Sequence, residues 1–172
     1  MEQALSSNKK IALISLVQFI VLLLAVSFAP LINNQIITGT IVNASLLIAV
    51  ILLGMRGAVL LCLLPSIFSL FLGLLPIVMA PMVPFIILGN IILVYIFNLL
   101  RTKNFFLGLI PAALIKFSFL FFISNFIISI FIKQAVADKI AVMMSYPQLI
   151  TALLGGIIAY VLTSRYNNKN NN

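Results

Sequence analysis

A single lysine stands inside an apolar stretch of this sequence. Lys116 lies in the segment AALIKFSFLF, and the run from Phe105 to Ile132 contains no other charged residue. A cation near the centre of a bilayer costs at least ~2.5–3.5 kcal/mol on insertion scales, and no acidic residue lies in any apolar segment to pair with it. We therefore interpret Lys116 as a group that meets an anionic or strongly polar ligand. The alternative is a neutral or carbonyl-bonded lysine that only packs.

Three amide side chains are expected near the depth of this lysine. Asn43, Asn90 and Gln148 each lie roughly one and a half to two turns from the outer end of a predicted helix. Polar groups left unsatisfied in lipid are costly, so all three should face the interior of a helix bundle. Together with Lys116 they are the predicted substrate-binding set. A single Asn or Gln in a membrane helix is more often a contact between helices, so a structural role stays open.

The composition places the chain in a membrane and leaves little material for catalysis. Hydrophobic residues make up 64% of the 172 residues, charged residues 7%, and the mean hydropathy is +1.32. There is no histidine, the acids are Glu2 and Asp138, and Cys62 is the one cysteine, which excludes an intrachain disulfide. No nucleophile–base pair or set of metal ligands can be assembled from these residues. We expect neither an enzyme nor a bound metal or cofactor.

Six apolar segments are long enough to cross a bilayer, which takes ~17–25 residues. We predict an all-α integral membrane protein with one domain over residues 1–164 and a disordered polar tail over 165–172. The predicted spans are 11–29, 38–54, 57–74, 84–100, 105–132 and 140–163. The segments 30–40, 75–84 and 133–139 are predicted to connect them. The first span is interpreted as a retained helix, because it is long for a cleaved signal sequence and Pro30 would follow the cut.

The distribution of cations predicts the orientation. If Lys9 and Lys10 are cytoplasmic, seven cations lie on that side and two on the other, so the positive-inside rule puts both termini in the cytoplasm. The net charge of +8 is then explained by membrane orientation and not by nucleic-acid binding. The seven are Lys9, Lys10, Arg56, Arg101, Lys103, Arg165 and Lys169, and the two are Lys133 and Lys139.

The sequence offers no energy source for transport. A proton- or sodium-driven carrier usually needs a carboxylate within the membrane, and none lies in a predicted span. There is also no glycine-rich Walker loop that would hold the phosphates of a nucleotide. If the chain moves a solute uphill, another polypeptide must supply the energy. This favours a subunit that captures substrate.

Four stretches resemble the substrate-binding S components of energy-coupling factor (ECF) transporters, within a subgroup of unknown substrate. They are ITGTIVNASLLIAVILLG (37–54), LPIVMAPMVPFIILGN (75–90), AALIKF (112–117) and QLITALLGG (148–156), and the likeness covers nearly the whole chain. The resemblance implies a six-helix bundle in the plasma membrane of a bacterium, which binds a vitamin-like micronutrient near its outer face. It also implies a T component with two ATPases as the partner that drives delivery inward.

The resemblance further implies a lid and a docking surface. The lid would be segment 30–40, in which Asn33, Asn34 and Gln35 are further candidates for substrate binding; an ordinary polar turn is the alternative. Family members often carry an Ala-x-x-x-Ala pattern on the first helix for docking, where this chain has Ala12 and Ser15, with Leu16 in the place of the second alanine. The last helix carries small residues that suit either the T component or internal packing. These are Ala152, Gly155, Gly156 and Ala159.

Two other classes of protein remain open. The first is a small structural membrane protein, such as a cell-shape subunit, that organises cytoplasmic or wall-synthesis partners. Polar groups that face lipid or bond one another would favour it, since a scaffold needs no pocket. The second is a passive channel or a membrane subunit of another complex, which a continuous water-lined path would favour.

Overall fold

The computed structural model describes residues 2–32, 34–71, 77–131 and 134–170, all within or beside helices. Five of its apolar helical segments are long enough to cross a membrane, and Gly54–Leu64 is a shorter apolar helix. The chain is therefore a multi-pass, all-helical membrane protein. The five segments are Lys9–Ile32, Gln35–Leu52, Ala80–Leu100, Phe105–Ile128 and Ile140–Ser164.

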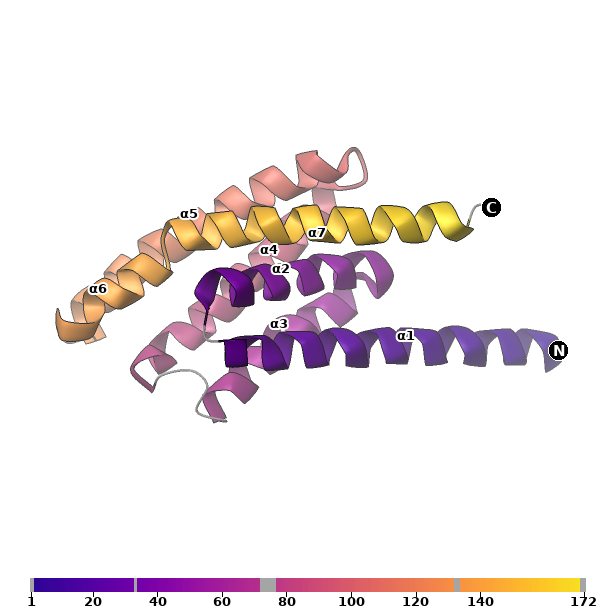
Figure 1. Ribbon diagram of the computed structural model, residues 1–172, viewed down its shortest axis with the longest axis horizontal. Coiled ribbons are helices and arrows are strands. Elements are labelled where there is room, and N and C mark those ends of the chain that lie inside the picture. Colours follow the sequence, from indigo (N-terminus) through magenta and orange to yellow (C-terminus); the bar gives the residue numbers. More distant parts are fainter. Residues whose placement is uncertain (1, 33, 72–76, 132–133, 171–172) are drawn as a thin grey trace.

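The helices run back and forth along one long axis, and both chain ends lie at the same end of the molecule (Figure 1). Helix α2 packs mainly against α7, and α4 packs mainly against α5, while α1 lies at the periphery against α2 and α3. The elements are α1 (Glu2–Phe28), the 3₁₀ turn η1 (Ala29–Ile32), α2 (Gln35–Leu52), α3 (Gly54–Phe71), the 3₁₀ turn η2 (Ile77–Met82), α4 (Val83–Leu100), α5 (Phe105–Phe131), α6 (Gln134–Met143) and α7 (Tyr146–Asn170).

Local sequence explains where α2 begins and ends and where α5 begins. Asn34 caps α2, because its side-chain oxygen accepts hydrogen bonds from the backbone N–H groups of Ile36 and Ile37 at 3.0 and 3.1 Å. Asn104 caps α5 in the same way, accepting from the N–H of Phe106 at 2.8 Å. Gly54 makes the tight turn from α2 to α3 with φ of +74°, a conformation that a side chain disfavours.

The core lies between α2, α3, α4, α5 and α7. Its largest fully buried side chains include Leu46, Leu47 and Phe97, and a second cluster around Met82 and Leu120 fills the other end of the bundle. Apolar side chains also cover much of the outside, above all on α1. In a membrane protein lipid covers such side chains, so they need no protein partner.

The structure differs from the predicted segments mainly at their ends. The predicted connection 133–139 is helical from Gln134 as part of α6. The interruption in helical structure comes later, between the end of α6 at Met143 and the start of α7 at Tyr146. Helix α1 already begins at Glu2, and α7 continues to Asn170 through most of the tail predicted to be disordered. The predictions followed the limits of the apolar runs, but a helix satisfies its backbone hydrogen bonds internally and can continue through polar residues.

Two further connections also differ from the prediction. Within segment 30–40 the structure has η1, and α2 starts at Gln35; within 75–84 it has η2 and the start of α4. Part of the second connection, residues 75–76, lies outside the described residues, as do residues 72–74 of the third predicted span. That span corresponds to α3, whose described apolar part is shorter than the other five segments.

Candidate functional site

Lys116 lies near the middle of α5 and faces the inside of the bundle. It stands eleven residues after Phe105, so its Cα is ~16 Å along the helix at 1.5 Å per residue. Ala112 and Ala113, one turn earlier, are fully buried, and so is Leu120, one turn later. Lys116 shares this face and is itself 2% exposed, so its ammonium group reaches neither lipid nor water.

The Lys116 ammonium is held by two amide oxygens from two other helices. Its Nζ donates hydrogen bonds to Asn43 Oδ1 on α2 at 2.6 Å and to Asn90 Oδ1 on α4 at 2.8 Å. Asn43 is 1% exposed and Asn90 is 5% exposed, so both bonds are buried. Because lysine has donors and no acceptor, the oxygen of each amide must face it, and each amide NH₂ group then points elsewhere.

The hydrogen bonds continue from Asn43 to α7. Asn43 Nδ2 donates to Thr151 Oγ1 at 3.1 Å, and Thr151 Oγ1 in turn donates to the main-chain oxygen of Gln148 at 3.2 Å. We refer to Lys116, Asn43, Asn90 and Thr151 as the Lys116 network. Side chains of four helices, α2, α4, α5 and α7, meet in it, so it forms only when the bundle is assembled.

Two glycines permit the close helix approach that this network requires. A Cβ on Gly155 of α7 would lie 2.7 Å from the backbone nitrogen of Ala44 and 2.8 Å from Asn43 Cβ. A Cβ on Gly89 of α4 would lie 3.1 Å from the Leu120 side chain on α5. Small residues let membrane helices pack closely in this way, and here they bring amides of α2 and α4 within reach of Lys116.

One polar atom beside the network has no partner within the described part of the chain. Thr40 lies one turn before Asn43 on α2, is 9% exposed, and its Oγ1 is buried without a hydrogen bond. The two acids of the sequence, Glu2 and Asp138, lie outside all five candidate spans. The partners of the Lys116 ammonium in the network are therefore neutral amides, and no candidate span contains a carboxylate that could pair with it.

Gln148 and Gln35 meet at a different place. Gln35 Nε2 donates to the main-chain oxygen of Met143 at 2.7 Å, and Gln148 Nε2 donates to the same oxygen at 3.2 Å. These bonds connect the start of α2 and the start of α7 to the end of α6. The Gln148 side chain is thus turned away from Lys116, and Gln148 contributes to the network through its main chain.

Asn34, a further residue of the predicted lid, does not join the network. Asn34 is exposed, and its side-chain oxygen is used to cap α2. Asn33 lies outside the described residues. A role of these residues in substrate binding stays a prediction.

The predicted docking residues fall into two groups. On α1, Ala12 is exposed and Ser15 is half-buried. On α7, the small residues are buried: a Cβ on Gly155 would meet α2, and one on Gly156 would meet Leu109 of α5. Ala152 and Ala159 are fully buried as well. In this conformation the small residues of α7 make internal contacts, whereas those of α1 lie at the outer surface.

Sequence reasoning missed Thr151 and Thr40. Thr151 lies three residues after Gln148, on the same side of one helix, so the spacing could have pointed to it. Threonine is common in membrane helices and often bonds to its own backbone, which makes it a weak signal. Thr40 has the same spacing to Asn43.

The network offers donors to any further group that enters it. Two of the three N–H donors of Lys116 are used in the bonds to Asn43 and Asn90, and its positive charge is not neutralised by either amide. Such a site can bind a group and orient it, but it contains no nucleophile–base pair.

No protein-family model matches this chain, and no curated protein or solved structure matches it.

Proposed function

We propose that this chain is the substrate-capture (S) component of an ECF-type importer in a bacterial plasma membrane. It would bind a small vitamin-like or anionic micronutrient near the outer face and pass it inward through a T component driven by two ATPases. The chain itself would carry out no catalytic step. The observation that supports this proposal best is the Lys116 ammonium, which is 2% exposed, lies within a candidate span and is held by neutral amides.

The charge of Lys116 is the physical reason to expect an anionic solute. Amide dipoles offset part of the cost of burying a cation, but they leave its net charge in place. An anion entering beside Lys116 would compensate that charge where the dielectric constant is low, and the attraction there is much stronger than in water. The amides of Asn43 and Asn90 would orient the solute, and the unpartnered hydroxyl of Thr40 lies one turn away on α2.

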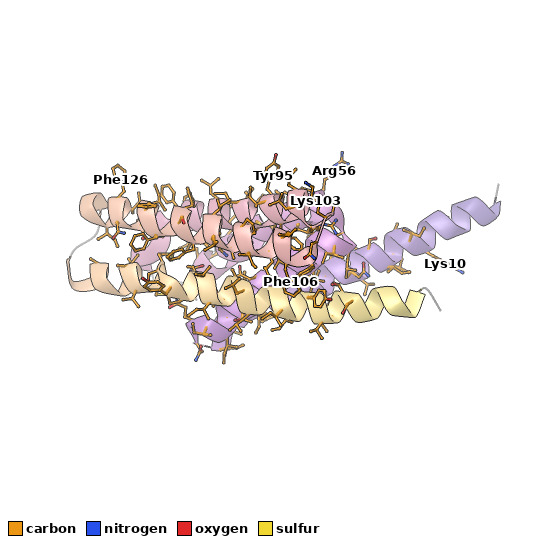
Figure 2. The ribbon with its side chains drawn as sticks, turned by 90° about the horizontal axis from the view of Figure 1, so that it is seen from above. Lys10, Arg56, Tyr95, Lys103, Phe106 and Phe126 are labelled. Atoms are coloured by element: carbon orange, nitrogen blue, oxygen red, sulfur yellow. The ribbon has the colours of Figure 1, made fainter. Side chains whose placement is uncertain are left out.

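The arrangement of the cations supports an orientation with both termini cytoplasmic. Lys10, Arg56 and Lys103 lie toward the end of the molecule that holds both termini, and Phe126 lies toward the opposite end (Figure 2). The positive-inside rule makes the basic end cytoplasmic. Gln35 and Gln148 would then lie on the outer side of Lys116, where the solute enters. Their bonds to Met143 would have to open or rearrange to admit it.

The proposed partner would contact α1. Ala12 and Ser15 lie in the outer part of this helix, which packs on α2 and α3 along its other face. The small residues of α7 would become available to a T component only if α7 separated from α2 and α5. Lipid would cover the rest of the apolar outer surface.

The proposal is tested by the solute that the protein retains. We expect mass spectrometry of the gently purified protein to identify a bound small anion, and co-purification to recover a T component and ATPases. Lys116→Ala should abolish retention of the solute, while Lys103→Ala, which removes an exposed cation, should leave it unchanged. A folded Lys116→Ala protein that retains the solute as well as the wild type would refute the role of the lysine.

A structural membrane protein is the second candidate, and one observation favours it. The members of the Lys116 network bond one another directly, so the network can hold four helices together without any ligand. Under this alternative no small molecule is retained, and Lys116→Met destabilises the fold, because it leaves the buried side-chain oxygens of Asn43 and Asn90 without a donor. Loss of a retained solute in the same variant supports capture instead.

A further inference from the structure

A second cation lies beside a cavity at the basic end of the molecule. The cavity has a volume of about 230 Å³, far more than one water molecule needs, and it lies between α2, α7 and the hairpin of α4 and α5. Arg101 is the one charged residue among those that line it, and none of them is acidic. The lining residues are Ile51, Arg101, Phe105, Tyr160, Thr163 and Ser164.

Of the polar side chains that line the cavity, Arg101 and Tyr160 have hydrogen-bond donors available for a ligand. Thr163 Oγ1 donates to the main-chain oxygen of Ala159 at 2.7 Å, and Ser164 Oγ donates to that of Val161 at 3.2 Å, so both hydroxyl hydrogens are already used. Arg101 uses Nε to bond Asn98 Oδ1 at 3.2 Å, which fixes the guanidinium and leaves its two NH₂ groups. The hydroxyl of Tyr160 adds another donor. Arg101 and Tyr160 can therefore bind an anion with oxygen acceptors.

The cavity lies where the headgroups of a membrane are expected. The candidate spans that border it end at Leu100, begin at Phe105 and end at Ser164. Tyr160 is 41% exposed, and its ring packs against Phe105 and Phe106 at centroid distances of 5.1 and 5.2 Å. Figure 2 shows Phe106 beside α7, at the same end of the bundle as Arg56 and Lys103. Aromatic side chains of this kind gather at membrane–water interfaces.

Exposed apolar side chains lie on the same two helices that line the cavity with Phe105 and Tyr160. On α7, Ile157 and Val161 are exposed, and on α5 Leu107 and Ile110 are exposed. A soluble anion would use Arg101 and Tyr160 but not these surfaces. A phospholipid would use both, because its acyl chains need an apolar surface directly next to its phosphate.

We propose that this cavity binds the phosphate group of an anionic phospholipid from the surrounding leaflet. Arg101 holds the phosphate oxygens through its NH₂ groups, and Tyr160 donates its hydroxyl hydrogen to the same group. Phe105 and Ile51 contact the glycerol region. The first turn of α5 adds the positive end of its helix dipole at Phe105. This site is independent of Lys116 and of the solute proposed above.

The proposal is tested by native mass spectrometry of the full-length protein in detergent, titrated with phosphatidylglycerol or phosphatidylcholine. We expect phosphatidylglycerol to be retained in preference to phosphatidylcholine. Arg101→Gln should weaken retention about fivefold, the effect of one cation at a membrane surface. Arg56→Gln is the matched control, since it removes an exposed cation from the same end without touching the cavity. Tyr160→Phe keeps the ring contacts and should weaken retention roughly threefold through one lost hydrogen bond.

Each other outcome contradicts the proposal. Equal loss in Arg101→Gln and Arg56→Gln would mean that general surface charge attracts the lipid and that the cavity does not. If inorganic phosphate displaces phosphatidylglycerol from the wild type, the site binds a soluble anion instead of a lipid. Should Arg101→Gln fail to fold, the Tyr160→Phe variant decides: unchanged retention in a folded protein would overturn the assignment.

Discussion

Lys116 and Arg101 are two cations that the same bundle places in opposite environments. Lys116 lies in the middle of α5, is 2% exposed, and bonds two amides from other helices. Arg101 follows the last residue of α4, is half-buried, and bonds an amide of its own helix, Asn98. The first is held by tertiary structure and the second by local structure.

This difference determines what each cation can do. Around Lys116, a ligand or substitution that leaves a buried oxygen or charge unpaired raises the free energy of the folded protein. The site therefore tolerates few occupants and depends on close packing. Around Arg101, water and headgroups can replace a lost partner, so the site can exchange its ligands. The buried cation suits selective binding or the assembly of helices, and the interfacial cation suits contact with lipid.

The largest effect is expected when one of the two amide partners of Lys116 is removed. Asn43→Leu leaves the Lys116 ammonium with one acceptor in the core and should lower the free energy of unfolding by about 1.5–3 kcal/mol. The matched variant Asn98→Leu removes the acceptor of Arg101, where solvent replaces it, and should change stability by no more than about 0.5 kcal/mol. Unfolding in mixed micelles measures both. Equal losses in the two variants would show that burial does not separate the two cations.

An intermediate effect is expected from adding one methyl group at each site. Gly155→Ala would press against the α2 backbone beside Asn43 and should cost about 1–3 kcal/mol of stability. Gly108→Ala would meet the backbone of Arg101 at 2.9 Å, but the connection after α4 can shift, so we expect a smaller loss.

The two glycine variants should also separate the two sites by function. Gly155→Ala should reduce retention of the solute without affecting retention of phosphatidylglycerol, and Gly108→Ala should do the reverse. Mass spectrometry of both variants gives both readouts. A variant that lowers both to the same extent would indicate a general loss of structure.

The smallest effect is expected from threonine hydroxyls on α7. Thr151→Val removes the acceptor of Asn43 and should cost about 0.6 kcal/mol, the usual size of a hydrogen bond between membrane helices. Thr163 is buried on the same helix, but its hydroxyl bonds only to carbonyls of α7, so Thr163→Val should lower the stability by less. A larger loss in Thr163→Val would argue against a stabilising contribution of the bond between helices.

Much of the fold could be predicted because the bilayer restricts it. Apolar length and the cost of unpaired backbone groups in lipid are enough to predict an all-helical, multi-pass chain. The same reasoning could not place α6 or the start of α1. Both continue through polar residues, where the helix depends on backbone bonds and not on hydropathy.

The site could be predicted in part for a similar reason. A cation in a candidate span has to turn inward, which places Lys116, and amides at a similar depth have to find partners, which favours Asn43 and Asn90. The direction of each side chain depends on neighbours that sequence spacing does not specify. Gln148 therefore bonds Met143 and leaves its predicted place in the network to Thr151.

The series of hydrogen bonds that starts at Lys116 ends on a main-chain oxygen, that of Gln148. Every residue type carries that oxygen, so mutational scanning should find position 148 permissive as far as this contact is concerned. Position 151 is restricted to residues that both accept and donate through a short side chain, which leaves serine as the natural replacement. With respect to this series of bonds alone, positions 148 and 151 would thus differ sharply in the substitutions that a library of variants retains.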